Sequence, residues 1–100
     1  MPKSGGAKHL WEAEYHPKAA QEIRALHGPV RERIRQAIEQ LQQEPWLGKA
    51  LVGRLTGLRS RRVGDYRIVY MIEEEAKKLF ILHVGPRGGA YTKVQRRRSR

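Results

Sequence analysis

Three strands are predicted within residues 58–84, which read LRSRRVGDYRIVYMIEEEAKKLFILHV. Apolar and polar residues alternate through 66–72, a pattern typical of a half-buried strand, and a first strand covers about 58–63. Residues 79–84 are nearly all apolar, as expected of a central strand covered on both faces. Turns at 64–65 and 73–77 separate these segments. The stretch therefore predicts a three-stranded antiparallel meander.

A helical hairpin is predicted upstream of this meander. Apolar residues recur at spacings of three and four in 17–26 and in 29–43, so each helix has one apolar face. Gly28 is typical of the residue that follows a helix, and Pro29 of the first turn of the next one. Residues 9–15 alternate as a strand does. The order β-α-α-β-β-β indicates an α+β domain in which the helices cover one face of a small sheet and leave the other open.

The chain has 100 residues, which is room for one domain. We predict a disordered leader at 1–8, a folded domain at 9–92 and a basic tail at 93–100. The tail is either an arm that binds RNA or the ribosome, or a solvated end. No apolar run resembles a signal peptide or reaches the roughly 20 residues that cross a bilayer, so we expect a soluble, cytoplasmic protein with no membrane partner.

The charge balance points to a polyanionic partner. The chain holds 21 Lys and Arg against 10 Asp and Glu, a formal net charge of +11. Such an excess attracts nucleic acid, a ribosome or an acidic protein. The sequence contains no cysteine, which excludes a disulfide scaffold, a thiolate nucleophile and a cysteine-ligated zinc site.

Arginine residues concentrate around the second strand of the meander. Period-two geometry places Arg67 on the open face and turns Tyr66 and Tyr70 toward the helices. Beyond the third strand, Arg87 and Tyr91 lie in a glycine-rich stretch that lets a ligand approach the backbone. Guanidinium groups hold phosphates bidentately, and tyrosine rings stack on unpaired bases. The remaining candidate RNA-binding residues are Arg54, Arg59, Arg61 and Arg62.

The histidine residues favour no metal site. His9, His16, His27 and His83 lack metal-ligand spacing, so we predict neither a metal nor another cofactor. His83 titrates near neutral pH and precedes Arg87 closely, which makes it a candidate general base. A histidine in an apolar strand is otherwise a packed core residue.

The motifs in 55–70 and 84–91 resemble the RelE/ParE toxin superfamily. The resemblance is carried by Leu-x-Gly-Leu at 55–58, Gly-Asp-Tyr-Arg at 64–67, Tyr70, Val-Gly-Pro-Arg at 84–87 and Tyr91. It covers about residues 9–92 and implies a RelE-like fold and the toxin of a toxin–antitoxin pair, with a cognate antitoxin as partner.

Within that superfamily, the RelE branch cuts mRNA in the ribosomal A site. The resemblance assigns Arg67, Arg87 and Tyr91 to catalysis without a metal: the RNA 2′-hydroxyl attacks its own phosphate, and the two arginines stabilise the transition state. The family's basic pair on the preceding strand aligns with Leu58 and Ser60. Arg59 and Arg61 stand one position away and replace the pair if the register shifts.

Two other functions remain open. The ParE branch of the same superfamily inhibits DNA gyrase by binding it, without catalysis. A third interpretation is an inactive toxin fold that only binds RNA or the ribosome. The grouping of Arg67, Arg87 and Tyr91 favours the nuclease, since a gyrase-binding protein has no need of it.

Overall fold

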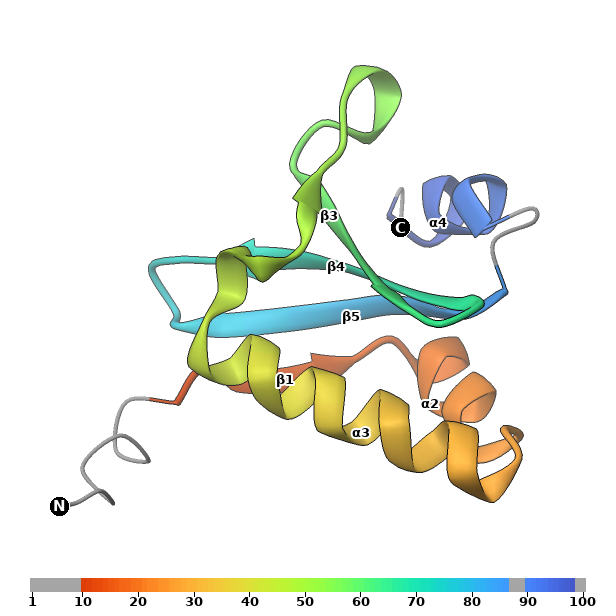
Figure 1. Ribbon diagram of the computed structural model, residues 1–100. Coiled ribbons are helices and arrows are strands. Elements are labelled where there is room, and N and C mark those ends of the chain that lie inside the picture. The colour runs from red at the N-terminus through yellow and green to blue at the C-terminus, as the bar shows by residue number, and fades with distance from the viewer. Residues whose placement is uncertain (1–9, 87–89, 99–100) are drawn as a thin grey trace, which may run out of the picture.

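The computed structural model describes residues 10–86 and 90–98, and its elements confirm the α+β class. The chain begins with β1 (Glu12–Tyr15), followed by the helices α2 (Pro17–Arg24) and α3 (Gly28–Gln43). The meander consists of β3 (Leu58–Val63), β4 (Tyr66–Glu73) and β5 (Lys78–Pro86). Figure 1 shows α2 and α3 against one face of the sheet. The predicted leader, 1–8, lies outside the described residues.

The sheet has five strands in the order β1-β5-β4-β3-β2. The predicted antiparallel meander is confirmed, whereas the central strand of the five is β4, and β5 is an interior strand between β1 and β4. Two features were not predicted. β1 pairs with β5 in parallel, and a fifth strand, β2 (Lys49–Ala50), lies at the edge of the sheet. A strand of two residues is too short to leave a period-two pattern in the sequence.

The first helix also ends earlier than predicted. Ala25 caps α2, and Gly28 begins α3 instead of ending α2. Gly28 precedes Pro29, whose fixed backbone angle suits the first turn of a helix. The apolar face of α3 is buried as expected, with Ile34, Ala37, Ile38 and Leu41 in the core.

The opposite face of the sheet is covered rather than open. The helix α4 (Ala90–Arg98) packs there, as Figure 1 shows. Leu58, Val69, Leu82 and Val94 form a second buried cluster beneath it. The expectation of an open face is therefore wrong. Residues 93–98, predicted as a tail, belong to α4 because Val94 is buried against the sheet.

Tyr70 fastens the segment after α3 to the sheet. Its buried hydroxyl donates to the carbonyl oxygen of Pro45 at 2.6 Å and accepts from the Gly48 N–H at 3.0 Å. A Cβ at Gly48 would lie 2.5 Å from that hydroxyl oxygen, so the contact requires glycine. The prediction that Tyr70 is a core residue is confirmed.

We expect Tyr70→Phe to lower the free energy of unfolding by about 1–3 kcal/mol, because it leaves two buried backbone groups without their partner. Urea denaturation of both proteins measures the difference. Tyr66→Phe is the matched control, since the Tyr66 hydroxyl makes no hydrogen bond within the described residues, and its effect should stay below about 0.5 kcal/mol. Equal effects of the two variants would contradict this role for Tyr70.

Candidate nucleic-acid interface

Arg67 lies at the centre of the candidate site, near the start of β4. It is paired with Arg62 on β3 and with Gly85 on β5. Residues opposite one another in an antiparallel pair share a face of the sheet, so Arg62 and Arg67 both lie on the face that α4 covers. Two like charges in this relation cost stability unless an anion lies between them. The pairing therefore favours an anionic ligand.

Tyr91, in the first turn of α4, completes the contact. Arg67 Nη1 donates a hydrogen bond to the Tyr91 hydroxyl, and the Arg67 guanidinium carbon lies 5.3 Å from the centre of the Tyr91 ring. Arg67 Nε is buried and has no hydrogen-bond partner among the described residues. Within 10–86 and 90–98, Arg67 forms no ion pair with a carboxylate. The structure thus brings Arg67 and Tyr91 together, whereas the predicted third member, Arg87, lies outside the described residues.

His83 is held rigidly on the same face of the sheet. The register of β4 and β5 shifts between Val69 and Tyr70, so that β5 accommodates one extra residue. His83 Nδ1 lies 3.1 Å from both carboxylate oxygens of Glu22 on α2. Its Nε2 is buried without a partner, and a Cβ at Gly85 would lie 3.1 Å from that atom. The ring therefore lies over Gly85, the residue opposite Arg67.

The surroundings of His83 favour its neutral form. Burial lowers the pKa of His83 from 6.5, and this outweighs the Glu22 carboxylate, which favours the protonated ring. A neutral ring that donates from Nδ1 to Glu22 carries a lone pair on Nε2. The side chain is only 3% exposed, as expected of a packed residue.

A partly buried ion pair joins α2 and α4 to β5. Arg97 on α4 donates to the two Glu22 oxygens at 3.0 and 2.8 Å and to the carbonyl oxygen of Leu82 at 2.8 Å. Glu22 also accepts from the Val84 N–H at 3.1 Å. Burial alone would raise the pKa of Glu22, but the hydrogen bonds from Arg97 and Val84 outweigh it and hold that pKa below 4.5. The pair fixes α4 on the sheet.

Arg59 and Arg61 do not join Arg67. The register of β3 and β4 has no shift, so both arginines share the face of Tyr70 and Ile68, on the side of α3. Arg59 donates to the carbonyl oxygens of Gly48 and Trp46, and Arg61 donates to Gln40 on α3. The register shift that would let them replace the family's basic pair is therefore absent between β3 and β4.

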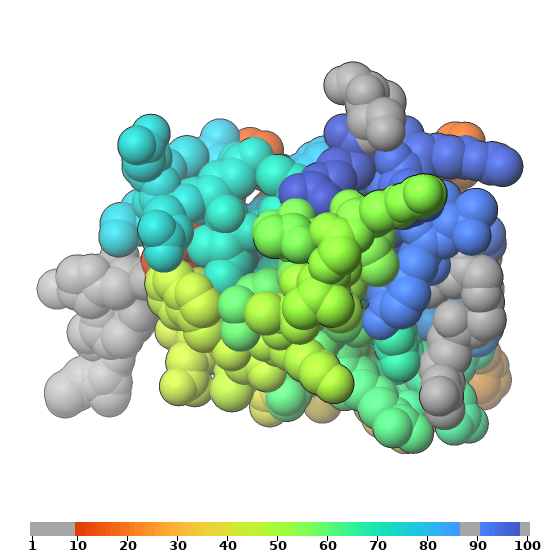
Figure 2. All heavy atoms as spheres, turned by 90° about the horizontal axis from the view of Figure 1, so that it is seen from above, coloured from red at the N-terminus to blue at the C-terminus, as the bar shows by residue number. Residues whose placement is uncertain are grey.

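Two other arginines predicted to bind RNA, Arg62 and Arg54, lie on the side of the sheet where α4 packs. Arg62 lies beside Arg67, and its Nε donates to the Gly64 carbonyl oxygen at 3.3 Å. Arg54 is exposed in the short helix η2 (Gly53–Leu55). Arg98 donates to the carbonyl oxygens of Arg54 and Thr56, and Figure 2 shows this segment against the C-terminal part of α4.

Sequence reasoning missed Glu22 and Arg97. In the sequence, Glu22 looks like an ordinary charged residue on the solvent-exposed face of a helix. Nothing nearby indicates that its partner is Arg97, 75 positions away. Arg97 had a usable signal: Tyr91, Val94 and Arg97 recur every three residues, the spacing of one helix face.

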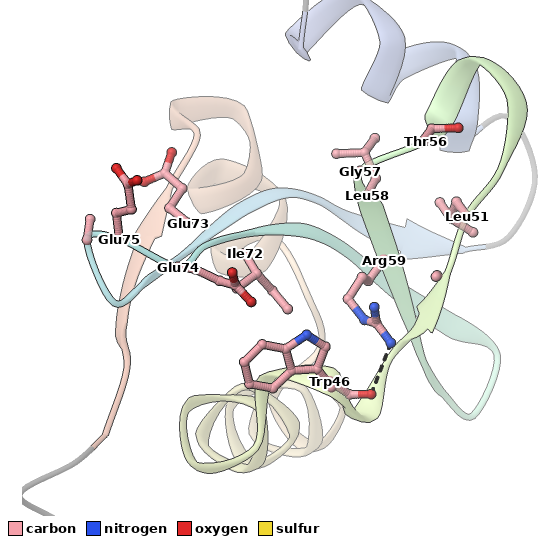
Figure 3. Close-up of a pocket in the computed structure, with 12 residues that line it drawn as sticks. Trp46, Leu51, Thr56, Gly57, Leu58, Arg59, Ile72, Glu73, Glu74 and Glu75 are labelled. Carbon is pink, nitrogen blue, oxygen red and sulfur yellow. Dashed lines mark hydrogen bonds between the residues drawn. The ribbon is translucent and has the colours of Figure 1, made fainter.

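A cleft of about 720 Å³ is lined by residues other than Arg67. Figure 3 shows the Trp46 ring near Ile72, with the Arg59 guanidinium hydrogen-bonded to the Trp46 carbonyl oxygen. Glu73, Glu74 and Glu75 also line this cleft. Three carboxylates repel a phosphate, so the cleft does not suit a nucleic-acid backbone.

The described residues contain no cluster of three or more His, Asp or Glu side chains that could hold a metal ion. None of the helices in the described ranges is both long and apolar enough to cross a membrane.

Comparisons with known proteins show which family the chain resembles. The family model described as the ParE toxin of type II toxin–antitoxin systems matches residues 13–91. Over 45 residues the chain is 44% identical to Toxin RelE of Mycobacterium tuberculosis, covering 45% of this chain and 46% of that relative. The match thus spans about half the length of the curated relative.

Solved toxin structures share the fold. The crystal structure of the RelBE2 toxin–antitoxin complex from M. tuberculosis has a TM-score of 0.72 and 29% identity, covering 78% of this chain and 99% of that one. A mutant of Escherichia coli toxin RelE in the free state has a TM-score of 0.76 and 22% identity, with coverages of 88% and 97%. The RelE–RelB complex from Pyrococcus horikoshii has a TM-score of 0.65 and 25% identity, with coverages of 81% and 99%. Because the family model matches most of its length, the chain belongs to the ParE toxin family of type II toxin–antitoxin systems, within the RelE/ParE superfamily.

Proposed function

We propose that the protein is a ribosome-dependent mRNA endonuclease, held inactive by a cognate antitoxin that covers its basic surface. The contact between Arg67 and Tyr91, with Arg62 beside it, carries this proposal. It gives a phosphate two guanidinium groups, and a tyrosine ring on which a base can stack. The RelE relatives solved together with RelB support an antitoxin partner.

The proposed reaction needs no metal and no nucleophile from the protein. The RNA 2′-oxygen attacks the adjacent phosphorus, the bond from phosphorus to the 5′-oxygen breaks, and the products are a 2′,3′-cyclic phosphate and a 5′-hydroxyl. Arg67 and Arg87 neutralise the charge that develops on the phosphate oxygens. The protein otherwise orients the RNA for in-line attack.

Two proton transfers complete the reaction. The Tyr91 hydroxyl accepts from Arg67 and keeps its own proton, which it can donate to the leaving 5′-oxygen. His83 is the candidate general base, because its Nε2 lone pair lies on the face that carries Arg67. Since the His83 side chain is only 3% exposed, the groups that cover it must move before RNA can reach it.

We expect Tyr91→Phe to lower the single-turnover rate of mRNA cleavage about a hundredfold, because the ring stays while the proton donor is lost. Tyr91→Ala should lower the rate further, since stacking is lost as well. Purified ribosomes programmed with a defined mRNA, with primer extension to map the 5′ ends, give these rates. Wild-type cleavage by Tyr91→Phe would exclude the hydroxyl as the proton donor.

The second candidate function is gyrase inhibition, favoured by the match to the ParE family model. A supercoiling assay with purified gyrase separates the two. Cut mRNA with normal supercoiling supports the nuclease, whereas inhibited supercoiling with intact mRNA supports gyrase binding. An inactive RNA-binding toxin fold would leave both mRNA and supercoiling unchanged while still binding ribosomes.

A further inference from the structure

A hollow of about 220 Å³ lies between α2 and α4, and all four residues that line it are cationic. Lys18 comes from the first turn of α2, and α4 contributes the other three, Lys93, Arg96 and Arg97. Among the described residues, no carboxylate lines the hollow. Its volume suits a group several times the size of a water molecule.

Three of the four charges are uncompensated. In the part of the chain that the structure describes, Lys18, Lys93 and Arg96 form no ion pair, whereas Arg97 is paired with Glu22. The first turn of α2 contains no acidic residue, so Lys18 adds a positive charge where the helix dipole is already positive. This arrangement costs free energy in the free protein, and a bound anion would relieve it.

Arg97 is already held in a fixed position at the hollow before any ligand binds. Its contacts to Glu22 and Leu82 use three of the five guanidinium N–H groups and hold the side chain in place. A fixed guanidinium loses little entropy when it donates its remaining N–H groups to an anion. Lys93 and Arg96 are exposed and can close around the same anion.

The cationic lining indicates which class of ligand the hollow can bind. Small-molecule sites are lined mostly by apolar side chains, and helices that lie on membranes present an apolar face. The lining of the hollow has neither feature. The apolar residue Val94 of α4 is instead buried against the sheet. A phosphodiester backbone needs only cations and hydrogen-bond donors.

We propose that Lys18, Lys93, Arg96 and Arg97 form a second phosphate site that binds RNA backbone separately from Arg67 and Tyr91. Lys93 and Arg96 follow Tyr91 by two and five residues, about 200° and 140° around the helix. They therefore face a different side of α4 from Tyr91 and hold another stretch of backbone. RNA as the ligand rests on the proposed function.

The test measures the salt dependence of RNA binding. Fluorescence anisotropy with a labelled, 2′-O-methylated single-stranded RNA, which cannot be cut through its 2′-oxygen, gives Kd at several KCl concentrations. Each lost phosphate contact reduces the slope of log affinity against log salt by about 0.7. We therefore expect Lys93→Gln/Arg96→Gln to reduce the slope by about 1.4, which weakens binding about 25-fold at 0.1 M salt.

The control is Arg24→Gln/Arg33→Gln, which removes the same charge from exposed positions outside the hollow. It should keep the wild-type slope. Equal losses in both double variants would overturn the proposal, since net charge alone would then explain them. The proposal would also be overturned if Lys93→Gln/Arg96→Gln changed the salt dependence of binding to an acidic peptide but not to RNA. A slope difference found together with no mRNA cleavage by the wild type would refute the nuclease while the phosphate site stands.

Discussion

Arg67→Ala is expected to lower the single-turnover rate of mRNA cleavage about a hundredfold to a thousandfold, the usual loss when one positioned donor to a transition-state anion is removed. Arg67 is preorganised for this task by its contact with Tyr91, and no carboxylate within the described ranges neutralises it. Rates measured on purified ribosomes at saturating toxin isolate this step from binding.

The matched control is Arg61→Ala, on the strand next to Arg67. Arg61 lies on the opposite face of the sheet and donates to Gln40 on α3. Its loss should change the cleavage rate less than threefold or so, an effect of under about 0.7 kcal/mol. If both variants lost activity equally, the face-specific site described above would be wrong. Melting temperatures of the two variants separate lost catalysis from lost folding.

Glu22→Gln is expected to destabilise the protein by about 3 kcal/mol at pH 7, because it leaves the guanidinium of Arg97 buried without its counter-charge. The Arg97 side chain is only 10% exposed, which limits compensation by water. Urea denaturation measures this loss. The control Glu32→Gln breaks an ion pair that is more than half exposed and should cost at most about 1 kcal/mol.

The same two proteins give a pH dependence. The folded state holds the pKa of Glu22 below 4.5, so its contribution is present above the unfolded pKa and is lost as pH falls through the lower, folded value. The difference between wild type and Glu22→Gln should therefore be constant from pH 7 to 5.5 and shrink below about pH 4.5. A difference that grows on acidification would contradict the direction of the shift.

The sequence predicted the elements whose patterns are local. Alternation in β4 placed Tyr70 in the core, and the nearly uninterrupted apolar run of β5 indicated a strand inside the sheet, although the central position belongs to β4. α4 was missed because its apolar signal reduces to Tyr91 and Val94, followed by a run of arginines that reads as a tail.

The site was predicted in part for the same reason. The alternation of side chains along β4 predicted the face of the sheet on which Arg67 lies. Which arginines of β3 share that face depends on how β3 pairs with β4. Arg62 joins Arg67, whereas Arg59 and Arg61 point to the helices. Register is a relation between two strands, and a single strand pattern does not contain it. The role of Glu22 could not be predicted, because its partners Arg97 and Val84 belong to elements that come together only in the folded chain.

The parallel pairing of β1 with β5 has a consequence for synthesis. β1 leaves the ribosome well before its neighbour in the sheet: Glu14 and Lys78, which form an ion pair, are 64 positions apart. At about 5–20 residues per second, the N-terminal strand waits on the order of ten seconds for its partner. A nascent chain therefore has an incomplete sheet until β5 has emerged and β1 can pair with it.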